Sequence, residues 1–211
     1  KLTKSPFASF IKNDKISVMG FSPERYLSKN NSKVISQPIK GTSRRSNDPD
    51  EDTYLFNKLL KSQKDISENI MIVDLVRNDL SVTAKSGSVN VDKLCGVYSF
   101  SNVHQMISTI SSELEKEIHF TEVIKTSFPM GSMTGAPKQM ALNLINKFEE
   151  NKRNLYSGSV GYITPDGDFD FNVVIRSLIY NYKRKYLSLS VGGAITSKSI
   201  PIKEYEECII K

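Results

Sequence analysis

The stretch from Phe128 to Lys138, FPMGSMTGAPK, combines residue types that suit a binding loop. Gly131 and Gly135 allow the backbone to turn sharply and to approach a ligand closely. Pro137 is typical of the first turn of a helix, and apolar residues follow it at helical spacing. The hydroxyl group of Ser132 and the free amides of that turn predict a cradle for an anion. An ordinary loop before a proline-started helix is the alternative, and spacing by itself leaves both open.

Two side chains near predicted strand ends could carry covalent and acid chemistry. Lys40 follows a strand and a proline and precedes Gly41. Burial of such a lysine lowers its pKa and makes the amine a nucleophile or a base. Glu24 follows Pro23 at a break between strands, and a carboxyl group with a raised pKa there could act as a general acid. For each residue the alternative is a solvated side chain on the surface.

Three glutamates are candidates for a metal site. Glu204 and Glu207 are three positions apart in a predicted helix and therefore share one face, with Lys211 one turn further along it. Glu68, at the head of an apolar segment elsewhere in the chain, could add a third carboxylate. Carboxylate oxygens with room for water suit Mg²⁺. A solvated, charged helix face is the alternative.

Other polar residues and glycines stand among apolar neighbours. His104 lies on a predicted strand, where a hydrogen-bonded core histidine is the ordinary interpretation. Arg176 interrupts the run VVIRSLI, so its guanidinium would need a carboxylate from the protein or from a ligand. Gly192 and Gly193 leave backbone amides open to a carboxylate. The sequence contains no Cys/His spacing typical of zinc, no serine nucleophile elbow and no GxGxxG dinucleotide loop.

The composition is that of an ordinary globular protein, with 38% hydrophobic and 25% charged residues. The net charge of +6 and the mixed basic and aromatic residues from Tyr180 to Tyr186 raise the question of nucleic-acid binding. That stretch fits a solvated hairpin turn better, and we expect no nucleic-acid partner. Apolar runs too short for a bilayer and two cysteines without a disulfide framework predict no membrane partner and a cytoplasmic location.

Strand and helix patterns separate along the chain. Alternation predicts strands at 7–11, 15–21, 25–28, 34–39 and 103–112, and again at 155–163, 169–182 and 186–195. Helical spacing predicts one helix from the acidic run at 48–52 to Ile66, a short helix at 120–127, and helices after Pro137 and at the end of the chain. The segment ENIMIVDLVRNDL fits helix or strand. Strands grouped apart from helices predict an α+β fold with antiparallel sheets.

A series of motifs occurs in the order typical of one enzyme family. The motifs are SPERY, PIKGT, ENIMIVDLVRNDL, VHQMIS, FPMGSMTGAPK, YSGSVGYI, DFNVVIRSL, VGGAI and EYEECIIK. Together they resemble the chorismate-utilising enzymes over nearly the whole chain. The resemblance implies an α+β fold with an antiparallel two-sheet sandwich and helices packed outside. Members of the family are longer, so it also implies that residues 1–211 are the C-terminal portion of a single chorismate-binding catalytic domain, truncated at its N-terminus.

The resemblance assigns a role to each candidate residue. Glu68, Glu204 and Glu207 resemble the carboxylates that hold Mg²⁺, the ion that grips the ring carboxylate of chorismate. Glu24 resembles the general acid that protonates the departing C4 hydroxyl group. The positions that resemble the substrate-binding groups of the family are His104, Ser132, Tyr156, Arg176, Gly192, Gly193 and Lys211.

Lys40 separates the branches of this family. Anthranilate synthases typically carry alanine in a PIAGT motif, whereas the lysine of PIKGT is typical of aminodeoxychorismate synthases. The resemblance then implies that Lys40 adds to C2 of chorismate with loss of the C4 hydroxyl group, and that ammonia enters at C4 and expels the lysine. No glutaminase motif is present, so ammonia is expected from a glutamine amidotransferase subunit or from solution.

Two alternatives remain open beside this interpretation. Within the family, the chain could be an anthranilate synthase or a salicylate/isochorismate-type synthase. Outside catalysis, a truncated chain could be a non-catalytic chorismate-binding or subunit-docking module.

Overall fold

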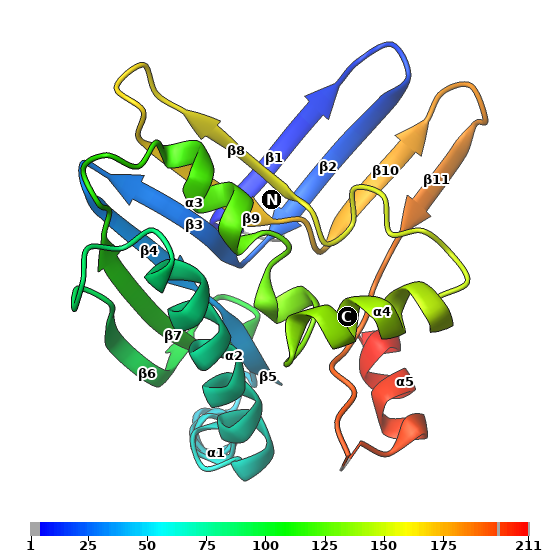
Figure 1. Cartoon of the computed structure of the whole chain (residues 1–211). Coiled ribbons are helices and arrows are strands. Elements are labelled where there is room, and N and C mark those ends of the chain that lie inside the picture. The colour runs from blue at the N-terminus through cyan, green and yellow to red at the C-terminus, as the bar shows by residue number, and fades with distance from the viewer. Residues whose placement is uncertain (1–4, 198, 211) are drawn as a thin grey trace.

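Two antiparallel sheets and the helices beside them make up the fold (Figure 1). The computed structural model describes residues 5–197 and 199–210. The larger sheet has the strand order β5-β7-β4-β3-β9-β8, with β6 also paired to β7, and the smaller sheet has the order β1-β2-β10-β11. The predicted α+β class with two antiparallel sheets is confirmed. The strands are β1 (Phe7–Lys12), β2 (Ile16–Ser22), β3 (Arg25–Asn30), β4 (Lys33–Gln37), β5 (Ile39–Arg44), β6 (Asn90–Ser99), β7 (Val103–Glu113), β8 (Ser159–Ile163), β9 (Phe169–Val173), β10 (Ser177–Asn181) and β11 (Tyr186–Leu189).

The chain passes between the two sheets at two corners. β2 leads into β3 through Pro23 and Glu24, and β9 leads into β10 through residues 174–176. The prediction of one strand over 169–182 is therefore wrong. The backbone leaves the extended region at Arg176, where φ is 53°, and the strand on the other side of this residue belongs to the smaller sheet. Figure 1 shows the smaller sheet extending away from the larger one beyond these corners.

Two other predicted strands are shorter than expected. The strand predicted at 155–163 is confined to β8, because Asn154 and Ser157 have φ values of 52° and 66° and form a turn ahead of it. The strand predicted at 186–195 ends with β11 at Leu189. Residues 190–197 then run without regular structure towards the last helix.

The single helix predicted from the acidic run to Ile66 is in fact two helices. α1 ends at Leu60, and the hydroxyl oxygen of Ser62 accepts a hydrogen bond from the backbone N–H of Asp65, which caps the second helix. The segment that fitted helix or strand belongs to that second helix. The helices are α1 (Pro49–Leu60), α2 (Gln63–Ser81), α3 (Phe120–Ser127), α4 (Lys138–Phe148) and α5 (Pro201–Ile210), with a 3₁₀ turn η1 (Gly131–Met133). Among the described helices, none is long and apolar enough to cross a membrane.

The core lies between α2 and the larger sheet. The side chains of α2 that face the sheet recur every three or four positions, which is the spacing of one helix face. From β7, alternate residues such as Met106 and Ile110 face α2, and both are fully buried. The buried cluster consists of Tyr26, Leu27, Val34, Ile72, Val73, Val76, Leu80, Ile110, Val123, Met130, Phe169 and Val173. This core fixes α2 against the larger sheet, and both carry candidate site residues.

A buried ion pair ties the start of α4 to α2. Lys138 Nζ lies 2.6 Å from a carboxylate oxygen of Asp79 and donates a second hydrogen bond to the carbonyl oxygen of Ser127. The two side chains are only 20% and 9% exposed. Burial raises the pKa of Asp79, and the ammonium group of Lys138 offsets only part of that rise. The negative charge of the buried Asp79 carboxylate is therefore stabilised by the ammonium group of Lys138.

Replacing Lys138 with methionine is expected to lower the free energy of unfolding by about 3 kcal/mol at neutral pH, because Asp79 would be left buried without its cation. The loss should shrink as the pH falls, since protonation of Asp79 then removes the uncompensated charge. Urea denaturation at two pH values measures both effects. Lys147→Met, on the exposed end of the same helix, is the matched control. Equal losses in the two variants would contradict the assigned role of the ion pair.

Candidate active site

Lys40, Glu24 and Ser132 come together from three separate parts of the chain. They lie on β5, at the corner between β2 and β3, and in η1. Nζ of Lys40 donates a hydrogen bond of 2.9 Å to the carbonyl oxygen of Ser132. The carboxylate of Glu24 is hydrogen-bonded to the side chain of Ser132 and to the backbone of Ile39, and it interacts with the charge of Lys40. The structure thus brings the candidate nucleophile, the candidate acid and the loop hydroxyl into one cluster.

Glu24 is buried, with only 4% of its surface exposed. Burial raises the pKa of its carboxyl group, and the hydrogen bonds from Ser132 and Ile39 and the charge of Lys40 offset that rise only in part. A carboxyl group of this kind keeps its proton at a higher pH than a solvated glutamate does. The surface alternative for Glu24 is excluded, and the side chain has the property that a general acid needs.

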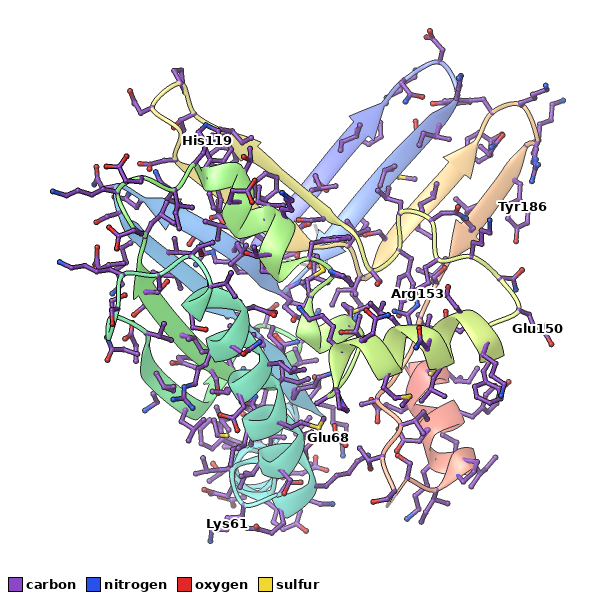
Figure 2. The ribbon with its side chains drawn as sticks, viewed as in Figure 1. Lys61, Glu68, His119, Glu150, Arg153 and Tyr186 are labelled. Atoms are coloured by element: carbon purple, nitrogen blue, oxygen red, sulfur yellow. The ribbon has the colours of Figure 1, made fainter. Side chains whose placement is uncertain are left out.

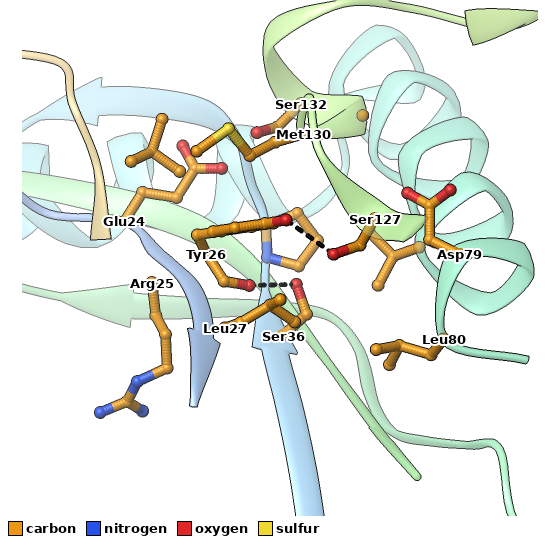
Figure 3. Close-up of a pocket in the computed structure, with 14 residues that line it drawn as sticks. Glu24, Arg25, Tyr26, Leu27, Ser36, Asp79, Leu80, Ser127, Met130 and Ser132 are labelled. Atoms are coloured by element: carbon orange, nitrogen blue, oxygen red, sulfur yellow. Dashed lines mark hydrogen bonds between the residues drawn. The ribbon is translucent and has the colours of Figure 1, made fainter. Parts of the chain in front are cut away.

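A small cavity adjoins Glu24 (Figure 3). Its walls include Tyr26, whose hydroxyl group shares a hydrogen bond of 2.6 Å with Ser127, and Met130 from the loop. The space open to water inside it is about 20 Å³, which holds about one water molecule. The cavity is therefore too small for a substrate, and Glu24 beside it is buried.

Gly41 determines the backbone conformation of β5 next to Lys40. The pairing of β5 with β7 shifts between Ile39 and Thr42, and Gly41 lies in this irregularity with a φ of +94°. A Cβ atom on Gly41 would lie 2.9 Å from the Cβ atom of Asp65 on α2. The glycine is required both by its left-handed backbone and by the close approach of β5 to α2. This local geometry places the half-buried Lys40 next to η1.

Glu68 and Glu204 meet between α2 and α5 around the ammonium group of a lysine. Nζ of Lys64 lies 3.0 Å from Oε1 of Glu204 and 4.0 Å from Oε1 of Glu68. The two carboxylate side chains are only 8% and 11% exposed. Oε1 of Glu68 is buried and has no hydrogen-bond partner among the described residues. Figure 2 shows Glu68 on the side of α2 that faces α5.

The three glutamates predicted to bind Mg²⁺ differ in how far they are buried. Glu207 is exposed on α5, and its charge also acts on Lys64. Within residues 5–197 and 199–210 no group of three acidic, histidine or cysteine side chains is already gathered as a metal site. All three glutamates nevertheless act on a single positive group, and one buried oxygen of Glu68 lacks a hydrogen bond. The oxygen donors therefore fit a hard cation at the position that the ammonium group of Lys64 approaches.

The predicted substrate-binding residues of the C-terminal part lie in two places. A Cβ atom on Gly192 would lie 2.8 Å from the hydroxyl oxygen of Tyr156, so these two residues are in contact. Burial raises the pKa of the Tyr156 hydroxyl group. Arg176 lies at the corner between β9 and β10 and forms no ion pair with a described residue. Gly193 is exposed beside Gly192, and Lys211 lies outside the described residues. Their substrate-binding roles stay predictions.

His104 is buried on β7, with both ring nitrogens already in hydrogen bonds. Nδ1 lies 2.9 Å from the hydroxyl oxygen of Ser99, and Nε2 lies 3.0 Å from a carboxylate oxygen of Asp52. This geometry matches the ordinary interpretation of a core histidine, and its substrate-binding role remains a prediction. The next residue, Gln105, has a buried Oε1 without a hydrogen-bond partner in the described part of the chain. Of these two neighbours on β7, Gln105 has a side-chain oxygen without a hydrogen bond to the described residues, whereas both ring nitrogens of His104 are hydrogen-bonded.

The family model described as chorismate binding enzyme matches residues 1–211. The chain belongs to this family. Aminodeoxychorismate synthase component 1 of Escherichia coli strain K12 is 39% identical over 208 residues, which cover 99% of this chain and 46% of that protein. The chloroplastic aminodeoxychorismate synthase of Arabidopsis thaliana is 42% identical over 210 residues, which cover 98% of this chain and 23% of that protein. The chain thus spans about half, or less, of the length of these relatives.

Two solved structures share the fold. Anthranilate synthase component I from Streptococcus pneumoniae TIGR4 has a TM-score of 0.85 and 32% sequence identity, over 97% of this chain and 45% of that one. The menaquinone-specific isochorismate synthase from Escherichia coli has a TM-score of 0.81 over 94% of this chain and 45% of that one. Its sequence identity is 22%, so this likeness shows the fold alone.

Proposed function

We propose that this chorismate-binding enzyme is the C-terminal catalytic part of an aminodeoxychorismate synthase. Such an enzyme converts chorismate and ammonia into 4-amino-4-deoxychorismate, a step towards para-aminobenzoate and folate. The observation that carries the proposal is the placement of Lys40 beside the buried acid Glu24, with its Nζ 2.9 Å from the carbonyl oxygen of Ser132. The names of relatives that are about 40% identical along the whole chain support it.

Lys40 and Glu24 divide the chemistry between them in this proposal. The neutral amine of Lys40 forms a bond to C2, the ring double bonds shift, and the C4–oxygen bond breaks. The hydroxyl group leaves as water with the proton of Glu24. Ammonia then bonds to C4, the double bonds shift back, and the C2–nitrogen bond to Lys40 breaks. Protons released by the two attacking amines restore the acid form of Glu24 and the free lysine.

The cofactor in this proposal is Mg²⁺, held by Glu68, Glu204 and Glu207. When bound, the ion would neutralise the ring carboxylate of chorismate. The chain's own part is to hold these carboxylates in place: Glu68 projects from the long helix α2, which the core fixes, and Glu204 and Glu207 share one face of α5. The nearly complete burial of the Glu204 side chain and the unpartnered oxygen of Glu68 support this assignment.

We propose further that ammonia comes from a glutamine amidotransferase subunit and that the enzyme is cytoplasmic. Residues 1–211 contain no glutaminase motif, so this part of the protein does not itself release ammonia from glutamine. Two free cysteines, Cys95 and Cys208, support the cytoplasmic location, because thiols persist in a reducing compartment.

Calorimetry with chorismate and Mg²⁺, followed by product analysis in the presence of an ammonium salt, tests the function. We expect chorismate to bind and 4-amino-4-deoxychorismate to form. Anthranilate or salicylate as the product would identify a different branch of the family. Binding without any product would favour a non-catalytic chorismate-binding module, and absence of binding would contradict both.

A further inference from the structure

Lys64 is one turn before Glu68 on α2 and lies between Glu68 and Glu204, two of the three glutamates of the proposed metal site. Its ammonium group is 3.0 Å from Glu204 and 4.0 Å from Glu68. The ammonium group donates a hydrogen bond to Glu204, and the charges of Glu68 and Glu207 also act on it. The positive charge of Lys64 therefore balances carboxylates that would otherwise repel one another.

The two sides of this contact differ in how firmly they are held. The carboxylate side chains of Glu68 and Glu204 are 11% and 8% exposed, whereas the side chain of Lys64 is 48% exposed. A lysine has a flexible four-carbon stem and a strongly hydrated head, so Lys64 can swing into solvent at little cost. The carboxylates cannot leave in the same way. The geometry is that of a fixed anionic site with a removable cation.

The hydrogen bonding is also incomplete. The ammonium group is within hydrogen-bonding distance of Glu204 but remains 4.0 Å from Glu68, whose Oε1 stays without a partner among the described residues. Lys64, which is on the same helix as Glu68, thus reduces the net negative charge of the site but leaves one carboxylate oxygen of Glu68 without a hydrogen bond from the described residues. A free divalent ion, which is not tethered, could approach all of the carboxylates.

We propose that Lys64 is a built-in competitor of the metal: its ammonium group takes the cation position between Glu68 and Glu204 when Mg²⁺ is absent, and Mg²⁺ must displace it to bind. This inference rests on the proposed function, because it takes the three glutamates as the magnesium site. It makes Lys64 a positioning residue that keeps the carboxylates together before the metal arrives, at the expense of metal affinity.

Isothermal titration calorimetry of the chain with Mg²⁺ alone tests the competition. Mg²⁺ can bind only to those molecules in which Lys64 has left the site, so the parent chain should show a reduced apparent affinity for Mg²⁺. Lys64→Met, in which the site is always open, should bind Mg²⁺ about fivefold more tightly than the parent chain. Lys64→Arg, which keeps the charge, should stay near the parent affinity. Lys61→Met is the matched control, since it removes a positive charge at the end of α1 without such contacts (Figure 2).

Heat denaturation gives a second readout that does not depend on activity. Without Mg²⁺, Lys64→Met should melt at a lower temperature than Lys61→Met, because the glutamates lose one of the positive charges that act on them. With saturating Mg²⁺ this difference should vanish. Equal or weaker Mg²⁺ binding by Lys64→Met, in a parent chain that does bind Mg²⁺, would overturn the competition and leave the metal site standing. Absence of Mg²⁺ binding in both would overturn the metal site and this inference together.

Discussion

Replacement of Lys40 by alanine is expected to reduce the formation of 4-amino-4-deoxychorismate at least about a thousandfold, because the tethered nucleophile is lost. A lysine held beside the substrate reacts at a far higher effective concentration than an amine in solution. Product analysis by chromatography, with chorismate and an ammonium salt as substrates, measures the effect. Anthranilate in place of aminodeoxychorismate would support the role given to the lysine.

Two further observations make this result specific. Lys40→Arg keeps the positive charge next to Glu24 and Ser132 but has no nucleophilic amine, so it should lose activity as well. Intact-mass measurement of the parent protein, quenched with chorismate but without ammonia, should detect an adduct that both variants lack. If amination proceeded unchanged in Lys40→Ala, the covalent mechanism would be wrong.

Replacing Glu24 with glutamine is expected to lower turnover by about 10²–10⁴-fold, because a positioned general acid contributes that much. The amide keeps the size of the side chain but has no proton to give to the departing hydroxyl group. Calorimetry should detect chorismate binding that is nearly unchanged, which separates a loss of chemistry from a loss of the site. Glu122→Gln, on the exposed surface of α3, is the control and should keep full activity.

Glu24 should also affect how the free energy of unfolding varies with pH. Burial raises the pKa of Glu24 in the folded protein above its value in the unfolded chain. The folded state therefore binds this proton more tightly, and the resulting stability is present at low pH and lost as the pH rises through the folded pKa. Glu24→Gln should be free of that loss and become relatively more stable than the parent at alkaline pH. Urea titrations over a pH series measure the difference, and parallel curves would contradict it.

Local patterns predicted those parts of the fold in which the chain's own neighbours decide the structure. The hairpins around Asn13 and at Pro165 to Gly167 follow from turn residues between alternating segments, and β7 follows from its β-branched alternation. The break between α1 and α2 at Ser62 was not predicted, because the helical spacing of apolar residues continues across it. The passage of the chain from one sheet to the other at Arg176 was not predicted either, because a single residue with positive φ does not change the alternating pattern of the residues around it.

The site followed from the sequence in a different way. The spacing of Lys40, Glu24 and Ser132 does not reveal their proximity, since they lie on elements that only the tertiary fold joins. Their assignment depended on the resemblance to a family, and the structure then supplied the contacts. Lys64 was overlooked, although its position four residues before Glu68 was a readable signal. Gln105 gave no such signal, because the burial of its Oε1 without a hydrogen-bond partner among the described residues depends on the tertiary fold.

The corners between the two sheets have a consequence for how the protein folds. Next to Glu24, Arg25 on β3 pairs with Asp170, which is 145 positions further along the chain, and β2 pairs with β10 across a similar separation. Contacts this distant in sequence require large loops to close before they stabilise anything, and folds that depend on them are slow to form. During synthesis on a ribosome, Glu24 and Lys40 would emerge well before the later segments that surround them in the folded protein. The acid would become buried only after Val173, which lines the same cavity, had been made.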